Sequence, residues 1–234
     1  SQHAPWLDCA FRDRQKIARF LNGLERRRCN KSHKPMDGIP YGAEPTHGMV
    51  YRHPVDVHFS LRTHAGNMKE DWLDYMFPED EAEGFRRFLT APATSSGTDD
   101  LTVASLVHHY REAKARAANG NVHFFHYADL TRDLPSQITR LAGLLGLPCS
   151  DILGDEIARA TNFKNMREAA KGSKRRFHDD TPFHDLADFF ASGSSNKWEG
   201  RLSGDLMADY AARMAELLPP EDIAWLNWGD RRGA

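Results

Sequence analysis

The sequence of 234 residues predicts one α/β domain in which helices flank a parallel sheet. Two short apolar runs, at 48–52 and 122–127, have the length and the residue types of strands. Segments with helical spacing of apolar residues follow each run, and a further one, at 101–118, separates them. Strands that alternate with helices along a chain are typical of a layered parallel sheet.

The composition argues against several classes of protein. Hydrophobic residues make up 40% of the chain and charged residues 27%, as in ordinary soluble domains, and the formal net charge is −2. That balance leaves no basic surplus for nucleic acid or for an anionic membrane. The three cysteines are widely spaced without a C-x-x-C pair, which indicates reduced thiols and a cytoplasmic location. No apolar run reaches the length of about 18 residues that a membrane-spanning helix needs.

The N-terminal part contains two predicted helices and two predicted strands. Apolar residues at helical spacing predict a helix over 11–24, and a short strand is expected at 27–32. The strand at 48–52 leads into a helix over 55–63, with Pro54 near its first turn.

The segment 67–100 is the least regular part of the chain. It mixes acidic residues with aromatic ones and ends in a serine- and glycine-rich stretch. Such an insertion serves either as a lid or partner surface, or as a short pair of helices packed on the core. The sequence leaves both interpretations open.

The second half of the chain is more regular. Apolar residues recur every three or four positions from Leu134 to Leu145, which predicts an amphipathic helix ending at Gly146. Charge and a proline make 171–185 a predicted loop, and Pro219 and Pro220 end the last predicted helix. The remaining predicted helices cover 101–118, 151–160 and 207–217.

The most informative segment is Arg52-His53-Pro54-Val55-Asp56, continued to Ser60. Arg52 ends a predicted strand, and Ser60 lies two turns into the next helix, so both face one pocket at the sheet edge. A guanidinium and a hydroxyl there suit a phosphate group. The segment resembles the R-x-P-x-D-x-x-x-S element with which sulfotransferases bind the 3′-phosphate of their donor.

A second resemblance lies upstream, in Lys31-Ser32-His33-Lys34-Pro35. It is similar to the sulfotransferase element K-[ST]-H-x-P, which implies that His33 is the catalytic base and that Lys31 stabilises charge in the transition state. A neutral imidazole is suited to take the proton of an attacking hydroxyl at neutral pH. The alternative is a surface histidine beside lysines.

Two further segments resemble adenine-binding elements of the family. Tyr127 to Leu130 resembles Y-E-D-L, with Ala128 in the glutamate position, and residues 161–166 resemble T-S-F-x-x-M. The resemblance implies that Tyr127 contacts the adenine, that Thr161 hydrogen-bonds it and that Phe163 stacks on it. The alternative for both aromatic rings is ordinary packing.

The segment that ends at Trp198 resembles the phosphate-binding loop F-x-R-K-G-x-x-G-D-W, but without its two cations. Ala191 and Ser192 stand in the arginine and lysine positions, Gly193 is kept, and Lys197 replaces the acid before the tryptophan. Backbone amides and hydroxyls of a serine- and glycine-rich run still suit an anion, so Gly193 is expected to contact the donor. The family's dimerisation stretch after this tryptophan is not matched, so the family's kind of dimer is not expected.

One family element has no match. Sulfotransferases open with a strand, a loop carrying a lysine that holds the 5′-phosphosulfate, and a helix. The chain instead begins with Ser1-Gln2-His3-Ala4-Pro5-Trp6-Leu7, which resembles the later segment H-x-P-[FW]-L. We therefore expect that the N-terminal strand, loop and helix are missing from these 234 residues. The alternative is a family member that has lost the loop and its activity.

Taken in order, these segments imply a single sulfotransferase-like domain over 1–234, with a three-layer parallel sheet like that of P-loop NTPases. The resemblance implies transfer of a sulfuryl group from 3′-phosphoadenosine 5′-phosphosulfate to a hydroxyl or amine of a small molecule. No metal, nucleic acid or membrane partner is expected. A catalytically inactive nucleotide-binding or scaffold protein and a P-loop kinase relative remain alternatives. The acidity of 67–100 favours a cationic or amine-bearing acceptor.

Overall fold

The sheet consists of two parallel strands, β1 (His47–Tyr51) and β2 (Val122–His126). The computed structural model describes residues 4–8, 13–69, 71, 73–93, 101–171, 183–185, 188–190 and 192–230. Within these residues, His47 pairs with Val122 and the register continues to Tyr51 opposite His126. The paired residues, such as Tyr51 and His126, are more than 70 positions apart in the sequence. This parallel pairing confirms the predicted α/β class.

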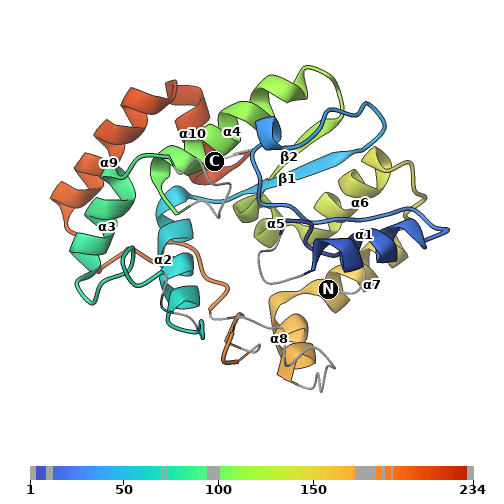
Figure 1. Ribbon diagram of the computed structural model, residues 1–234, viewed down its shortest axis with the longest axis horizontal. Coiled ribbons are helices and arrows are strands. Elements are labelled where there is room, and N and C mark those ends of the chain that lie inside the picture. The colour runs from blue at the N-terminus through green and yellow to red at the C-terminus, as the bar shows by residue number, and fades with distance from the viewer. Residues whose placement is uncertain are drawn as a thin grey trace.

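Helices cover both faces of this sheet. In Figure 1, α4 (Val103–Ala117) and α10 (Pro220–Trp228) lie on one side of the strands, and α5 (Tyr127–Arg132) and α6 (Leu134–Leu144) lie on the other. Neighbouring strand residues point to opposite faces. Phe124 packs at 5.7 Å from Trp225 of α10, whereas Arg140 of α6 lies 4.4 Å from the ring of Phe125. The sheet is therefore the middle layer of three.

The remaining helices extend these two layers. In the part of the chain that the structure describes, three helices, α2, α3 and α4, connect β1 to β2, and six helices follow β2. Among the described residues, no helix combines the length and the apolar character that crossing a bilayer requires. The bounds not yet given are α1 (Arg14–Asn22), η1 (Met36–Gly38), α2 (Pro54–Ala65), α3 (Glu81–Thr90), α7 (Asp151–Thr161), α8 (Phe163–Lys171) and α9 (Gly204–Leu217).

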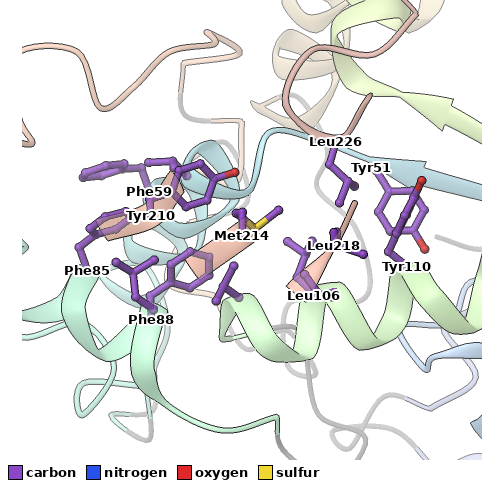
Figure 2. Close-up of a cluster of buried hydrophobic side chains, with 14 of the residues drawn as sticks. Tyr51, Phe59, Phe85, Phe88, Leu106, Tyr110, Tyr210, Met214, Leu218 and Leu226 are labelled. Carbon is purple, nitrogen blue, oxygen red and sulfur yellow. The ribbon is translucent and has the colours of Figure 1, made fainter. Parts of the chain in front are cut away.

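The core lies between α2, α3, α4, α9 and the sheet (Figure 2). Phe85 and Phe88 of α3 are fully buried in it, together with Phe59 of α2 and Met214 of α9. Burying each such side chain stabilises the fold by about 1.5–3 kcal/mol. The α3 part of segment 67–100 is therefore an integral part of the core, as the helix-packing interpretation of that segment requires.

The structure corrects two sequence predictions and leaves a third largely untested. The strand predicted at 27–32 is absent, and Lys31 makes only a single bridge to Trp6. The helix predicted to be the last is followed by α10, because Pro220 occupies the first turn, where its missing N–H costs nothing. The predicted loop at 171–185 lies largely outside the described residues, and α8 precedes it.

Candidate active site

The site is built where β1 passes into α2. Arg52 follows the last residue of β1, and His53 is the N-cap of α2, where its Nδ1 atom accepts the backbone N–H of Val55 at 3.2 Å. Burial holds the pKa of His53 at about 4, so its ring is neutral and its Nδ1 is free to accept. The first turn of α2 thus lies at the carboxyl edge of the sheet, the usual place for an anion in such folds.

Arg52 and Ser60 are neighbours, as the sequence predicts. The Nη1 atom of Arg52 lies 3.4 Å from the Oγ atom of Ser60. The same guanidinium forms an ion pair with the buried carboxylate of Asp56, with 3.3 Å between Nη2 and Oδ2. Because Asp56 is one helical turn before Ser60, α2 fixes the guanidinium above the serine hydroxyl.

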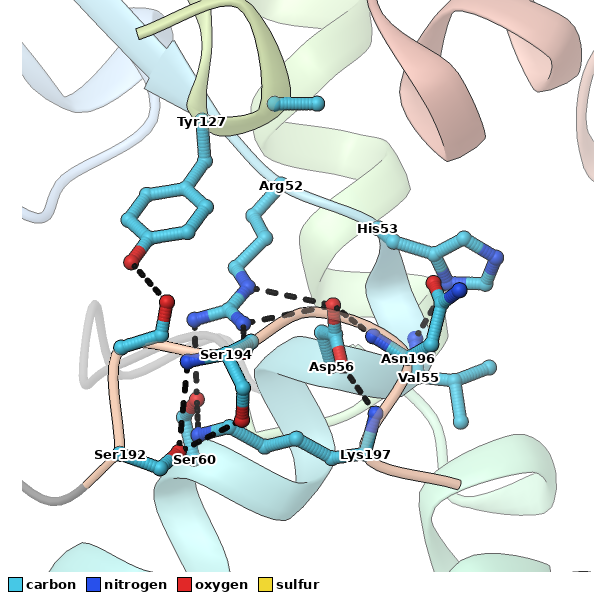
Figure 3. Close-up of polar contacts among 12 residues, drawn as sticks. Arg52, His53, Val55, Asp56, Ser60, Tyr127, Ser192, Ser194, Asn196 and Lys197 are labelled. Carbon is cyan, nitrogen blue, oxygen red and sulfur yellow. Dashed lines mark hydrogen bonds and ion pairs between the residues drawn. The ribbon is translucent and has the colours of Figure 1, made fainter. Parts of the chain in front are cut away.

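The C-terminal loop closes over this pair (Figure 3). Asp56 accepts the backbone N–H groups of Asn196 at 3.1 Å and Lys197 at 2.9 Å. Arg52 also donates to the backbone carbonyl of Ser194. A single carboxylate therefore orients both the arginine and the loop.

Trp198 anchors the end of that loop. Its ring packs at 4.2 Å from the ring of His53, with an angle of 31° between the planes. The loop is thereby fixed to the N-cap of α2 from one side and to Asp56 from the other.

Tyr127, Gly193 and Phe163 form the aromatic side of the same group. Tyr127 follows β2, and its ring lies 4.2 Å from the Cζ atom of Arg52. The Tyr127 hydroxyl donates to the carbonyl of Gly193 at 3.1 Å. Gly193 has a φ of +64°, and a Cβ atom there would lie 2.8 Å from Cδ2 of Phe163, so only glycine fits without a shift. Five of the eight predicted site residues thus meet at this edge: Arg52, Ser60, Tyr127, Phe163 and Gly193.

Thr161 is close in sequence to Phe163, but its hydroxyl is engaged elsewhere. It donates to the carbonyl of Ile157, one turn earlier in α7, at 2.7 Å. A ligand would have to compete for this O–H or donate a hydrogen bond to the exposed hydroxyl oxygen.

Lys31 and His33 belong to a second group, around the N-terminal segment. The backbone N–H of Lys31 donates to the carbonyl of Pro5 at 2.9 Å, and the ring of His33 packs at 4.3 Å from the ring of Trp6. Ser32 donates to Asp8 at 2.7 Å. These contacts hold the Lys31–His33 turn against residues 4–8.

His109 of α4 connects the two groups. Its Nδ1 atom lies 2.8 Å from the hydroxyl of Tyr51, the residue directly before Arg52. Burial, with a smaller contribution from the neighbouring His33, lowers the pKa of His109 to about 4. His109 is therefore neutral and borders the His33 turn without carrying a charge.

Comparison with known proteins identifies the family. The family model described as the sulfotransferase domain matches residues 1–218. The chain belongs to the sulfotransferase family. A glycolipid sulfotransferase of Mycobacterium bovis (strain BCG / Pasteur 1173P2) is 26% identical over 257 residues, which cover 98% of this chain and 78% of the relative. Sulfotransferase 1E1 of Bos taurus is 20% identical, over 85% of this chain and 64% of that protein.

Solved structures show the same fold for this sulfotransferase. Mouse sulfotransferase SULT7A1 complexed with PAP has a TM-score of 0.69 and 17% identity, over 90% of this chain and 73% of that one. Retinol dehydratase in a complex with retinol and PAP has a TM-score of 0.69 and 19% identity, over 93% and 70%. The predicted family and the predicted layered fold are both confirmed.

The sulfotransferase site also contains residues to which the sequence assigned no role. Asp56 organises the group, and the Nζ atom of Lys197 donates to the Oγ atom of Ser60 at 3.0 Å. The signal for Lys197 was present as a lysine in the place of an acid before Trp198. Its side-chain direction toward α2 has no signature in the sequence.

Proposed function

We propose that this sulfotransferase transfers the sulfuryl group of 3′-phosphoadenosine 5′-phosphosulfate to a hydroxyl or amine of a small-molecule acceptor. The observation that carries the proposal is the pairing of Arg52 with Ser60 at the carboxyl edge of the sheet, beside Tyr127 and Gly193. A cation, a hydroxyl and aromatic rings at one helix N-terminus suit a phosphorylated adenosine.

The chain offers residues for the 3′-phosphate and for the adenine of the donor nucleotide. Arg52 and Ser60 would hold the 3′-phosphate, with the Gly193 backbone beside it. Tyr127, Thr161 and Phe163 would contact the adenine, because flat rings and a hydroxyl suit a purine. The clash that a Cβ atom at Gly193 would create with Phe163 indicates a tightly shaped wall at this place. When bound, the donor supplies an activated sulfuryl group.

His33 and Lys31 are the proposed catalytic residues. The imidazole of His33 would take the proton from the acceptor hydroxyl, and the ammonium of Lys31 would stabilise the negative charge of the transition state. The ring contact with Trp6 supports a fixed orientation for His33. Fixed cations and backbone amides serve for charge stabilisation, so the proposal needs no metal.

The acceptor class is proposed from the relatives and from the acidic segment. The curated mycobacterial relatives act on glycolipids according to their names, and one structural neighbour carries retinol. We propose that the acceptor is a hydroxyl-bearing small molecule, and glycolipids are the first class of acceptor to test. A cationic acceptor is the alternative that the acids of 67–100 favour.

The test is a sulfuryl-transfer assay with the purified protein. A pooled acceptor library is incubated with the donor, and products are identified by mass spectrometry. His33→Ala should lower kcat by about 10²-fold or more and leave the affinity for PAP unchanged, since a general base acts in the chemical step. Unchanged turnover in this variant would exclude His33 as the base.

One observation favours a second function, a nucleotide-binding protein without transferase activity. Ala191 and Ser192 stand at the positions of the two cations of the family loop. Tight binding of PAP without transfer to any acceptor would support this alternative over the enzyme.

A further inference from the structure

We propose that Lys197 is a cationic ligand of the donor's 3′-phosphate and supplies charge that the family loop normally carries at the positions of Ala191 and Ser192. This inference rests on the proposed donor and assigns a residue that the family pattern does not. The family pattern has an acid at the position of Lys197, so the role is specific to this chain.

The geometry places two cations at one hydroxyl. The Nζ atom of Lys197 lies 3.0 Å from Oγ of Ser60, and Nη1 of Arg52 lies 3.4 Å from the same oxygen. Figure 3 shows both side chains reaching this hydroxyl from opposite elements, Arg52 from the end of β1 and Lys197 from the C-terminal loop. Two like charges held this close repel each other unless an anion lies between or beside them.

The charge around Lys197 is not balanced by the protein. Within the described part of the chain, no ion pair involves its ammonium, and its side chain donates only to Ser60. Asp56, whose charge acts on Lys197, is committed to the Arg52 guanidinium and to the two backbone N–H groups of the loop. A half-buried ammonium with a neutral partner is a binding site for an anion rather than a closed structural contact.

The electrostatics agree with this geometry. Burial lowers the pKa of Lys197, and the positive charge of Arg52 lowers it further. A bound phosphate dianion would reverse both effects, because it replaces the lost hydration and offsets the arginine charge. A phosphate bound at Ser60 would therefore interact favourably with both cations.

The loop is constructed so that Lys197 reaches α2. The backbone N–H of Lys197 donates to Asp56 at 2.9 Å, and the next residue, Trp198, packs on His53. Ser60 lies one turn after Asp56 along the same helix. The lysine side chain therefore runs along α2 by one turn, from its backbone anchor to the hydroxyl that Arg52 also contacts.

The experiment compares two nucleotides by isothermal titration calorimetry. PAP and 5′-AMP differ only in the 3′-phosphate. Lys197→Gln should weaken PAP binding by roughly 10- to 100-fold, the size of one charge-assisted hydrogen bond, and change 5′-AMP binding by less than about threefold. Lys197→Arg should retain most of the PAP affinity. Lys16→Gln in α1 is the matched control, since it removes the same charge at an exposed position.

Two results would overturn the inference. PAP affinity in Lys197→Gln equal to that of the wild type would exclude the lysine as a ligand. An equal loss of affinity for PAP and 5′-AMP would mean that Lys197 maintains the structure of the loop instead. Thermal melting of Lys197→Arg and Lys197→Gln identifies a folding defect. If the wild-type protein binds no PAP, the proposed donor itself is wrong, which is a separate and distinguishable result.

Discussion

Gly193 packs against Phe163 so closely that a Cβ atom on the glycine would lie 2.8 Å from Cδ2 of the ring. The same glycine accepts the hydroxyl of Tyr127 through its carbonyl. One residue without a side chain thus joins α5, α8 and the C-terminal loop. The close approach fixes the spacing between the two aromatic rings that we propose for the adenine.

Replacing Gly193 with alanine should therefore damage the site more than the fold. The variant meets both the left-handed backbone penalty, about 1 kcal/mol, and the contact with Phe163. We expect the affinity for PAP to fall by roughly tenfold or more, which corresponds to a loss of about 1.4 kcal/mol in binding free energy. Calorimetric titration with PAP measures this.

Gly200→Ala is the matched control for that prediction. Gly200 also has a positive φ, +74°, but nothing lies within 4 Å of a Cβ atom there. It should lose similar stability in thermal melting and bind PAP like the wild type. Equal losses of affinity in both variants would show that backbone strain, and not the contact with Phe163, controls the site.

Phe88 tests the role of α3. Its side chain is fully buried in the core, so Phe88→Ala should lower the free energy of unfolding by about 3–5 kcal/mol. Phe20 of α1 is 44% exposed, and Phe20→Ala should cost less than about 1 kcal/mol. Urea denaturation measures both values. Similar small losses would mean that α3 is a detachable lid and not part of the core.

His58 makes the protein sensitive to acid. The ring is fully buried among phenylalanines at 5.0–5.5 Å, including Phe85 and Phe88, and neither ring nitrogen has a hydrogen-bond partner among the described residues. Burial lowers its pKa to about 4. The unfolded chain, with an ordinary pKa of about 6.5, takes up the proton first, so stability should fall between pH 6.5 and 4 and level off below.

His58→Leu should reduce this acid sensitivity, and His53 and His109, which burial also holds at a pKa of about 4, retain the remainder. At pH 7.5 the variant should gain about 1–2 kcal/mol in the free energy of unfolding, because an unsatisfied buried polar group is lost. The gain should increase at pH 5, where the wild type is losing stability. His184→Leu, at an exposed position, is the control and should leave the stability profile unchanged. A pH profile in His58→Leu identical to that of the wild type would assign the acid sensitivity to other histidines.

The features predicted correctly from the sequence are those determined by residues close together in the chain. Arg52 and Ser60 were placed correctly because a strand end and a helix eight positions later determine their relative position. The missed helix α10 begins at a proline that in other contexts ends a helix. The prediction of a strand at 27–32 was wrong. Among the described residues, this segment pairs with no strand and makes a single bridge, from Lys31 to Trp6.

Long-range contacts explain what the sequence left out of the site. Lys197 reaches Ser60 across 137 positions, and only the folded loop brings them together. Thr161 matched the family pattern, but its hydroxyl is bonded within α7. A motif fixes which residues are present, whereas the direction of each side chain depends on packing that no short pattern records.

The most direct test of the account is a crystal structure of the protein with PAP. The account predicts that the oxygens of the 3′-phosphate lie within hydrogen-bond distance of the Arg52 guanidinium and the Ser60 hydroxyl, at the N-terminal turns of α2. A bound nucleotide whose phosphates lie remote from both residues would contradict it.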